Sequence, residues 1–429
     1  MPRHLLLTAL STLLLASCTD STDDDLDLID DGDVIDEPGQ PSISSDGEGV
    51  DAEVLAACSV TIAKKSELMI TDLAVVEDPV RTTWTGGLAT ASDGAWHFGR
   101  LMTEMAGANP AEPFVRSWLN QWSAERTVNG QKVAARPISK VFDAWPKLAG
   151  GKLDLTKPPM RLLAIVNRFD LRSAGNAGEG RFVFGVLDAT GNQTQFTIIL
   201  EYKLPAANAA AVSTWANDWH ALGALPLGSA QYRTKLQQIT RKFAKRDAFA
   251  GRPNGSAISQ VRTNEIALTG PWELREFHLT TTGQLRMATL AQTPAHDDLI
   301  DHNNTPLLAD YMTQNAAAIK AQTHVVPATF EGQPFAAAHV HNNIDFWNAP
   351  GITDSLLRHR FSLNTCNGCH GAETNTFFLH VNPRNPGQEA PLSGFITGET
   401  VNDPITGAPR TFNDLQRRAN GFKAFLCAP

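Results

Sequence analysis

The sequence predicts an α+β fold, with a large domain of helices and an antiparallel sheet followed by a small, mainly α-helical module. Three observations lead to this prediction. Apolar runs of strand length follow one another in the middle of the chain, helical patterns form a separate group, and two further strand-like runs flank the turn Thr282-Gly283. With 429 residues, of which 42% are hydrophobic, the chain has room for two domains with buried cores.

Residues 1–18 are expected to form a lipoprotein signal peptide. Arg3 and His4 precede an apolar run, residues 5–15, that is too short to span a membrane as a stable helix. The run ends in Leu-Ala-Ser-Cys18, which resembles the bacterial lipobox. The resemblance implies cleavage before Cys18, lipidation of its thiol, and an exported protein held at the cell envelope, facing the periplasm or the outer surface. The alternative is an ordinary secretory signal in which Cys18 has no role.

Residues 19–56 are expected to form an acidic, disordered tether. This stretch contains fourteen acidic residues and no Lys or Arg, so it repels itself and cannot bury enough surface to order. The whole chain has a formal charge of -9, but without these acids and Arg3 it keeps 31 acidic and 35 basic residues, a charge near +4. The acidic balance therefore belongs to the tether.

Residues 57–344 are expected to form the large α+β domain. Its helices and strands follow from apolar residues at helical spacing and from short apolar runs. The expected helices cover residues 96–105, 114–122, 209–222 and 230–249, and the expected strands cover residues 161–166, 181–187, 194–204, 274–279 and 285–290.

A Gly-rich stretch, residues 175–180, is expected to connect two of these strands. A dinucleotide-binding fingerprint would open a helix, whereas this stretch opens a strand, so we do not assign it nucleotide binding. Charged and polar residues gather at the two strand ends. A salt-bridge network that holds the connection is favoured over an anion pocket for this set, which comprises Asn167, Arg168, Asp170, Arg172, Glu179 and Arg181.

Histidines are frequent between residues 296 and 341. His339 and His341 would lie on one face of a strand, a spacing that can serve a metal ion. No acidic partner is placed near them by sequence spacing, so hydrogen-bonded or surface histidines are the favoured interpretation for this group, which comprises His296, His302, His324, His339 and His341.

The most specific motif is Cys366-Asn-Gly-Cys369-His370. Its C-x-x-C-H spacing is typical of c-type haem attachment, because two thiols on one turn can each add to a vinyl group of the same porphyrin. The following histidine, His370, then supplies an axial nitrogen to the iron. The alternatives are a redox-active disulfide and half of a zinc site. Haem is favoured because the chain has no second C-x-x-C and no preceding βαβ unit.

The last part of the chain, residues 345–429, resembles a small class I cytochrome c. An expected helix over residues 352–361 leads into the motif, a Pro- and Gly-rich loop follows at 374–398, and a helix is expected over 412–426. The segment around the motif is also similar to the ends of uncharacterised bacterial lipoproteins. The cytochrome resemblance implies one covalent haem c, His370 as the proximal ligand, a terminal helix packed on the helix before the motif, and electron transfer.

The sixth iron ligand departs from that family. Class I members usually place a Met after the haem site, but the last Met in this chain is Met312. His380, on the expected loop, is therefore predicted to be the second axial ligand, so that His370 and His380 bind the iron. The iron could instead stay open or be met by a residue of the large domain, such as Met287, Met312 or His341.

The five cysteines divide among three roles. With Cys18 lipidated and Cys366 and Cys369 bound to haem, Cys58 and Cys427 are left, and an exported protein meets the oxidising conditions that can pair them. We therefore predict a Cys58–Cys427 disulfide. Without haem, Cys58 could pair with Cys366 or Cys369.

These features together predict an exported, lipid-anchored monohaem c-type cytochrome that passes electrons at the cell envelope to an unidentified redox partner protein, with no role for nucleic acid. Signatures of metalloproteases, serine hydrolases and nucleoside triphosphatases are missing from the sequence. Two alternatives stay open. One is a peroxidase-like haem enzyme with an open iron position, and the other is a haem-free surface binding lipoprotein with a disulfide-stabilised C-terminus.

Overall fold

A computed structural model describes residues 58–428, except residues 174, 298 and 342–345. The described chain contains 14 helices and one large sheet of eight strands, about 33% helix and 23% strand. This confirms the predicted α+β class. Cys18 and the expected tether lie outside the described residues.

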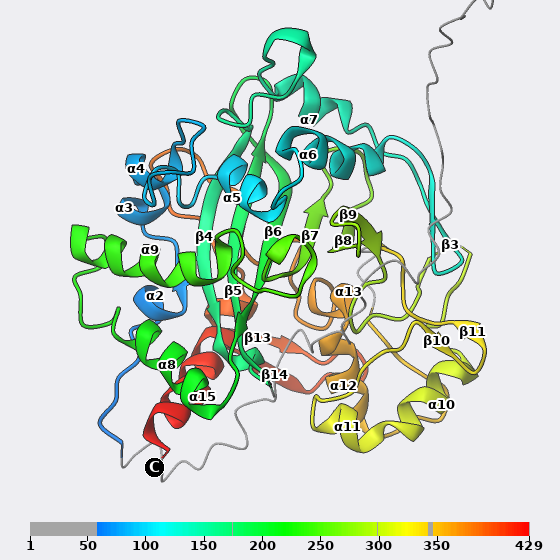
Figure 1. Ribbon diagram of the computed structural model, residues 1–429. Helices are drawn as coiled ribbons and strands as arrows, with labels where there is room; N and C mark the ends of the chain where they lie inside the picture. The colour runs from blue at the N-terminus through cyan, green and yellow to red at the C-terminus, as the bar shows by residue number, and fades with distance from the viewer. Residues whose placement is uncertain (1–57, 174, 298, 342–345, 429) are drawn as a thin grey trace, which may run out of the picture.

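The eight-stranded sheet is antiparallel throughout and forms the centre of the molecule (Figure 1). Its order is β1-β4-β5-β6-β7-β8-β12, and β9 pairs with β8. The strands are β1 (Met69–Ile70), β4 (Met160–Arg168), β5 (Asn176–Leu187), β6 (Gln193–Pro205), β7 (Ile258–Glu265), β8 (Glu273–Leu279), β9 (Leu285–Ala288) and β12 (Val340–His341). Short hairpins join β2 (Arg126–Val128) to β3 (Gln131–Val133) and β10 (Thr329–Phe330) to β11 (Gln333–Pro334).

The three expected central strands form the meander β4-β5-β6, but the Gly-rich stretch before the second of them is not a connection. Residues Asn176–Gly180 already belong to β5, opposite the end of β4. A Cβ atom at Gly178 would lie 2.2 Å from the carbonyl oxygen of Arg168, and its φ is 89°. Glycine is therefore needed there because the two backbones approach closely, not because the chain turns.

One face of the sheet is covered by helices and packed with aromatic side chains. In Figure 1, α5 and α9 lie in front of the central strands and α6 lies above β9. Phe98 meets Phe184 with ring centroids 5.3 Å apart, and Trp122 meets Phe277 at 4.8 Å. The helices of this part of the chain are α2 (Lys64–Glu67), α3 (Leu73–Val76), α4 (Pro79–Thr82), α5 (Phe98–Met105), α6 (Ala111–Leu119), α7 (Ser139–Ala144), α8 (Ala209–His220) and α9 (Ala230–Ala244).

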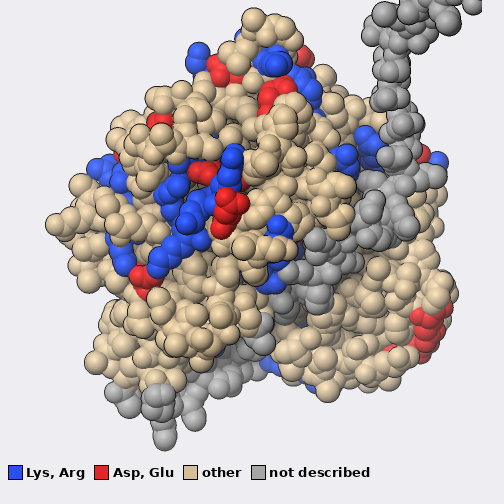
Figure 2. Space-filling model, in the orientation of Figure 1, with Lys and Arg blue, Asp and Glu red and all other residues tan. Residues whose placement is uncertain are grey.

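The charges visible on this side are mixed in sign. Figure 2 shows acidic and basic atoms gathered in the area of α9 and α5. Arg241 of α9 pairs with Glu104 of α5 at 3.4 Å, and Lys242 pairs with Asp218 of α8. The helix α9 ends at Ala244, five residues earlier than the expected helix over 230–249.

The C-terminal segment covers the other face of the sheet. Its elements are α10 (Pro306–Gln314), α11 (Ala316–Lys320), α12 (Ser355–Asn364), α13 (Cys366–Cys369), α14 (Gly394–Thr397), the hairpin β13 (Glu399–Asn402) and β14 (Pro409–Phe412), and α15 (Asp414–Cys427). One cluster of buried apolar side chains extends from Leu68 through the sheet to Leu363, Phe395 and Phe422. Part of the C-terminal segment thus shares a core with the sheet, while Trp347, Leu357 and Phe361 form a second cluster with α10 and α11. A separate haem module stays a prediction.

The last helix packs differently from what the cytochrome resemblance implies. Its principal neighbours are α14, α8 and α2, whereas α12 packs mainly against α11 and α13. The sulfur atoms of Cys58 and Cys427 are bonded, with Cα atoms 6.0 Å apart. This is the disulfide predicted from the sequence, and it links α15 to the start of the described chain.

Candidate functional site

The motif Cys366-Asn-Gly-Cys369-His370 forms one short helical turn, α13, that begins directly after α12. Thr365 caps the turn, since its hydroxyl accepts a hydrogen bond from the N–H of Gly368 at 3.1 Å. A Cβ atom at Gly368 would lie 2.1 Å from the carbonyl oxygen of Ser362, so only glycine fits between the two helices. The turn places both thiols and the His370 ring toward the sheet.

A cavity lies between this turn and the sheet face opposite the aromatic core. The cavity volume, with its open mouth included, is about 920 Å³. Apolar side chains from both walls line it, among them Val183 and Ile199 of the sheet and Leu379 and Phe395 of the C-terminal segment. The polar lining comprises Arg168, Arg181, Thr197, Glu201, Arg262, Asn264, Cys366, Cys369, His370, His380, Asp414 and Arg418.

His370 is held as a metal-binding histidine usually is. Its Nδ1 donates a hydrogen bond to the carbonyl oxygen of Phe378 at 2.6 Å, which fixes the ring and leaves Nε2 as the basic nitrogen. Trp272 stacks on the ring with centroids 5.4 Å apart and planes 27° apart. Burial lowers the pKa of His370 from 6.5 to about 4, so the ring is neutral at neutral pH.

The two cysteines are free and buried. Burial raises the pKa of Cys366 and that of Cys369 above the usual value, so both are neutral thiols. A nucleophilic or redox-active cysteine needs its pKa lowered, and these surroundings do the opposite. The thiols therefore suit attachment of an apolar group better than thiolate catalysis.

His380 lies beside the motif although it is ten residues further along the chain. Its Nε2 is 3.4 Å from the Sγ of Cys369, and its Nδ1 is 2.9 Å from the hydroxyl of Ser393. The centroids of the His370 and His380 rings are 4.2 Å apart. The two histidines predicted to bind the iron thus lie side by side at the cavity, and their binding to one iron stays a prediction.

The present ring spacing admits iron on only one of these two histidines. Metal–imidazole bonds of about 2 Å on opposite sides of an ion put the two nitrogens about 4 Å apart and the ring centroids further still. A porphyrin between His370 and His380 would require the rings to separate by roughly 2 Å. His380 as the sixth ligand stays a prediction that involves this movement.

The sheet wall of the cavity carries a ladder of buried ion pairs. Arg181 pairs with Glu179 at 2.6 Å and with Glu201 at 3.0 Å. Arg262 pairs with Glu201 at 3.2 Å and with Glu276 at 2.7 Å. Burial raises the pKa of Glu201, whereas Arg262 and His278 outweigh burial and lower that of Glu276 to about 2.

A second charged group, at the floor of the cavity, carries an excess of positive charge. Three guanidiniums, those of Arg168, Arg417 and Arg418, surround two carboxylates, those of Asp170 and Asp414. Burial and the neighbouring Arg168 lower the pKa of Arg418 to about 10. The Nε of Arg418 is buried without a hydrogen-bond partner among the described residues. This corner of the cavity suits an anionic group.

The residues present therefore fit a haem c in three respects. Two free thiols and His370 stand at attachment spacing, the His370 ring is oriented by a backbone carbonyl, and the cavity floor, with three guanidiniums and two carboxylates, has an excess of positive charge where propionate carboxylates would lie. Salt bridges also join Arg168 to Asp170 and Arg181 to Glu179, as the sequence favoured for the polar cluster near the Gly-rich stretch. Sequence reasoning missed Glu201, Arg262 and Glu276, because partners on neighbouring strands carry no fixed spacing along the chain.

Comparison of the chain with family models, with curated proteins and with solved structures found no match. Among the helices that the structure describes, none combines the length and the apolar character needed to cross a bilayer.

Proposed function

We propose that the protein is exported, anchored by a lipid on Cys18, and carries one covalent haem c with which it transfers electrons at the cell envelope. A single observation supports this most strongly. The turn bearing Cys366, Cys369 and His370 forms one wall of a buried cavity whose other walls offer apolar surface and positive charge.

Each residue would have a definite role. Cys366 and Cys369 would hold the porphyrin by thioether bonds, and Nε2 of His370 would be the axial nitrogen. When bound, the haem supplies one-electron redox chemistry. The carbonyl of Phe378 keeps the proton of His370 on Nδ1, and Trp272 holds the plane of the ring. Arg418, whose Nε is buried without a hydrogen bond among the described residues and lies 4.0 Å from Oδ2 of Asp170, would receive a carboxylate of the porphyrin.

The cysteines support an exported location. A disulfide such as Cys58–Cys427 forms and persists in oxidising compartments. Within the same chain, Cys366 and Cys369 are free thiols only three positions apart. A haem bound to both would keep them from pairing in the oxidising setting that joins Cys58 to Cys427.

A second candidate is a haem enzyme whose iron keeps an open position. The ring spacing of 4.2 Å favours it, because His380 does not lie opposite His370 at ligand distance across an iron. In that case His380 would stay on the cavity wall, held by Ser393, and a small substrate would meet the iron.

The first experiment replaces both thiols. We expect Cys366→Ala with Cys369→Ala to abolish haem that survives denaturing electrophoresis, because no thioether can form. The matched control, Cys58→Ser with Cys427→Ser, removes two other cysteines and should keep the haem. Covalent haem in the first double variant would contradict the proposal.

The second experiment distinguishes the two candidates through His380. If His380 binds the iron, His380→Ala should convert a six-coordinate low-spin absorption and magnetic circular dichroism spectrum into a high-spin one. Ser393→Ala, which removes only the hydrogen bond at Nδ1, should keep the low-spin spectrum. A wild-type spectrum that is already high-spin would select the haem enzyme, and an unchanged low-spin spectrum in His380→Ala would eliminate His380 as a ligand.

A further inference from the structure

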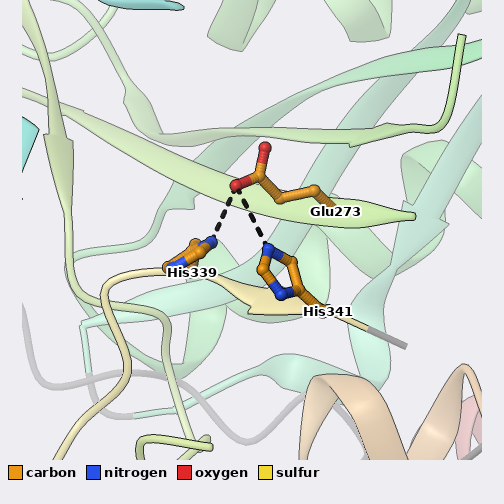
Figure 3. Close-up of side chains that lie close together, drawn as sticks. All are labelled: Glu273, His339 and His341. Atoms are coloured by element: carbon orange, nitrogen blue, oxygen red, sulfur yellow. Dashed lines mark hydrogen bonds and ion pairs between the residues drawn. The ribbon is translucent and has the colours of Figure 1, made fainter. Parts of the chain in front are cut away.

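We propose that Glu273, His339 and His341 form a second site, which binds a divalent first-row transition-metal ion such as Zn²⁺. The three side chains converge in Figure 3, with the carboxylate of Glu273 pointing at both imidazoles. The sequence suggests the His-x-His pair but not the acid, which lies 66 residues earlier. The sheet register supplies the acid, since His341 of β12 is directly opposite Glu273 of β8.

The geometry is close to that of a three-ligand site. Nδ1 of His339 is 2.7 Å from Oε1 of Glu273, and Nε2 of His341 is 3.9 Å from the same oxygen. The three ligand atoms lie within 4.8 Å of one another. Bonds of about 2 Å in a tetrahedral arrangement require ligand atoms about 3.3 Å apart, and the separations here, from 2.7 Å to no more than 4.8 Å, differ from that by at most about 1.5 Å.

The chemistry of the donor set selects the class of ion. Two imidazole nitrogens and one carboxylate oxygen suit zinc and neighbouring transition ions, whereas calcium and magnesium prefer oxygen ligands. Three protein ligands leave a coordination position open for water or a substrate.

The surroundings orient the carboxylate for such an ion. Oε2 of Glu273 is held by Nε of Arg275 at 2.9 Å and by Nε of Arg136 at 2.7 Å, while Oε1 faces the histidines and makes a longer contact of 3.4 Å with Nη2 of Arg275. The two guanidiniums repel a cation, but Glu265 pairs with Arg136 at 2.5 Å and offsets one of them. Ligating carboxylates are commonly fixed in this way by a further hydrogen bond.

The alternation of side chains along β8 and β12 explains why the metal site reaches solvent and why it is separate from the cavity beside the motif. Glu273 and His339 are buried, whereas the side chain of His341 is 28% exposed and opens the site to solvent. The neighbouring residues Leu274 and Val340 point to the other face of the sheet, where they pack with Cys366. The metal site therefore lies back to back with the motif, and it does not depend on the haem proposal.

The other group of potential ligands among the described residues is less suited. His359, Glu373 and Asp403 also converge, but both carboxylates bind Arg358, and Asp403 binds Arg410 as well. Arg358 holds each carboxylate of this group at 2.8 Å, closer than the 3.4 Å contact of Arg275 with Oε1 of Glu273. We therefore assign the metal to the group on β8 and β12.

The test measures Zn²⁺ and Co²⁺ binding to the full chain after removal of metals by a chelator. We expect one ion per chain, a tetrahedral or five-coordinate cobalt spectrum, and at least about tenfold weaker binding in His341→Ala. His341 is chosen because its partial exposure makes it the least structural of the three. The matched control is His220→Ala, since His220 has a 32% exposed side chain and also faces a buried carboxylate, Glu67.

The same titration in the Cys366→Ala, Cys369→Ala background excludes the thiols as the site. Binding that is unchanged there and weakened only by His341→Ala supports the assignment. A wild-type chain that binds neither ion, or a His341→Ala variant that binds like wild type, would overturn it. A thiolate-to-cobalt charge-transfer band lost with the cysteines would likewise place the ion at the motif instead.

Discussion

The two faces of the central strands of the sheet bury different kinds of side chain. The face under α5, α6 and α9 carries Phe184, packed on Phe98, and Phe277, packed on Trp118 and Trp122. The face toward the C-terminal segment carries Arg181, Glu201 and Arg262, which are charged although their side chains are at most 12% exposed. Alternate residues of the same strands supply both faces. The proposed metal ligands lie on the aromatic side, but at the edge of the sheet where β8 pairs with β12.

The difference has an energetic meaning. Burying an aromatic side chain stabilises the fold by about 2 to 3 kcal/mol. Buried ion pairs recover little more than their desolvation cost, and apolar residues of equal volume are often as good or better. The ion pairs of the charged face therefore stabilise the sheet no better than apolar residues of equal volume would. We take its presence beside the motif as support for a bound group that the charges position.

The first prediction concerns what holds the charged side in place. The Cys58–Cys427 disulfide closes a loop of 369 residues and fastens α15, which carries Asp414 and Arg418 into the cavity. Replacing both cysteines by serine should lower the free energy of unfolding by up to about 5 kcal/mol, since the unfolded chain gains freedom. Urea unfolding measures this, with the reduced wild-type protein as the control. A loss below about 1 kcal/mol would show that the charged side keeps its packing without the disulfide.

The second prediction concerns the removal of one charge from the charged face. Arg262→Met leaves Glu201 and Glu276 without their shared partner and should cost about 3 to 5 kcal/mol at neutral pH. The triple variant Arg262→Met, Glu201→Leu, Glu276→Leu removes the charges together and should recover most of that loss. Denaturant unfolding compares the two. Equal loss in both would mean that the ion pairs stabilise the fold, and the contrast between the faces would fail.

The third prediction uses a buried polar group far from both faces as a reference. His324 is buried, both of its ring nitrogens lack a hydrogen-bond partner among the described residues, and burial lowers its pKa from 6.5 to about 4. The unfolded state therefore binds the proton first, and the wild type should lose up to about 3 kcal/mol as the pH falls from 6.5 to 4.

His324→Leu should remove that part of the pH dependence and raise stability at neutral pH by about 1 to 3 kcal/mol, because an unsatisfied polar group is lost. Thermal unfolding followed across this pH range gives both values. A variant with the same pH slope as wild type would assign the slope to other buried histidines, such as His97.

The apolar side of the sheet could be predicted from the sequence, and the charged side largely could not. The strands β4 and β6 were expected because each contains an apolar run of strand length. β7 was missed, because its cavity-facing residues Gln260, Arg262 and Asn264 are polar although buried. A pattern of hydrophobicity cannot recognise a strand whose inner face is charged, since it predicts polar residues to be exposed.

The candidate site divides in the same way. Spacing along the chain identified the two thiols and His370. The disulfide between Cys58 and Cys427 was predicted because the other three cysteines already had roles. The acid beside His339 and His341 could not be found, because Glu273 is brought there by the pairing of β8 with β12. Arg418 was missed for a similar reason, since α15 reaches the cavity only through tertiary packing.

The mass of the intact mature protein tests the central claim most directly. The chain would be produced with its own leader in a host that attaches haem to exported proteins, purified, denatured and weighed. The account predicts a polypeptide heavier by the mass of one haem that stays bound under denaturing conditions and is lost in Cys366→Ala with Cys369→Ala. A mass that corresponds to free or disulfide-bonded Cys366 and Cys369, with no added porphyrin, would contradict it.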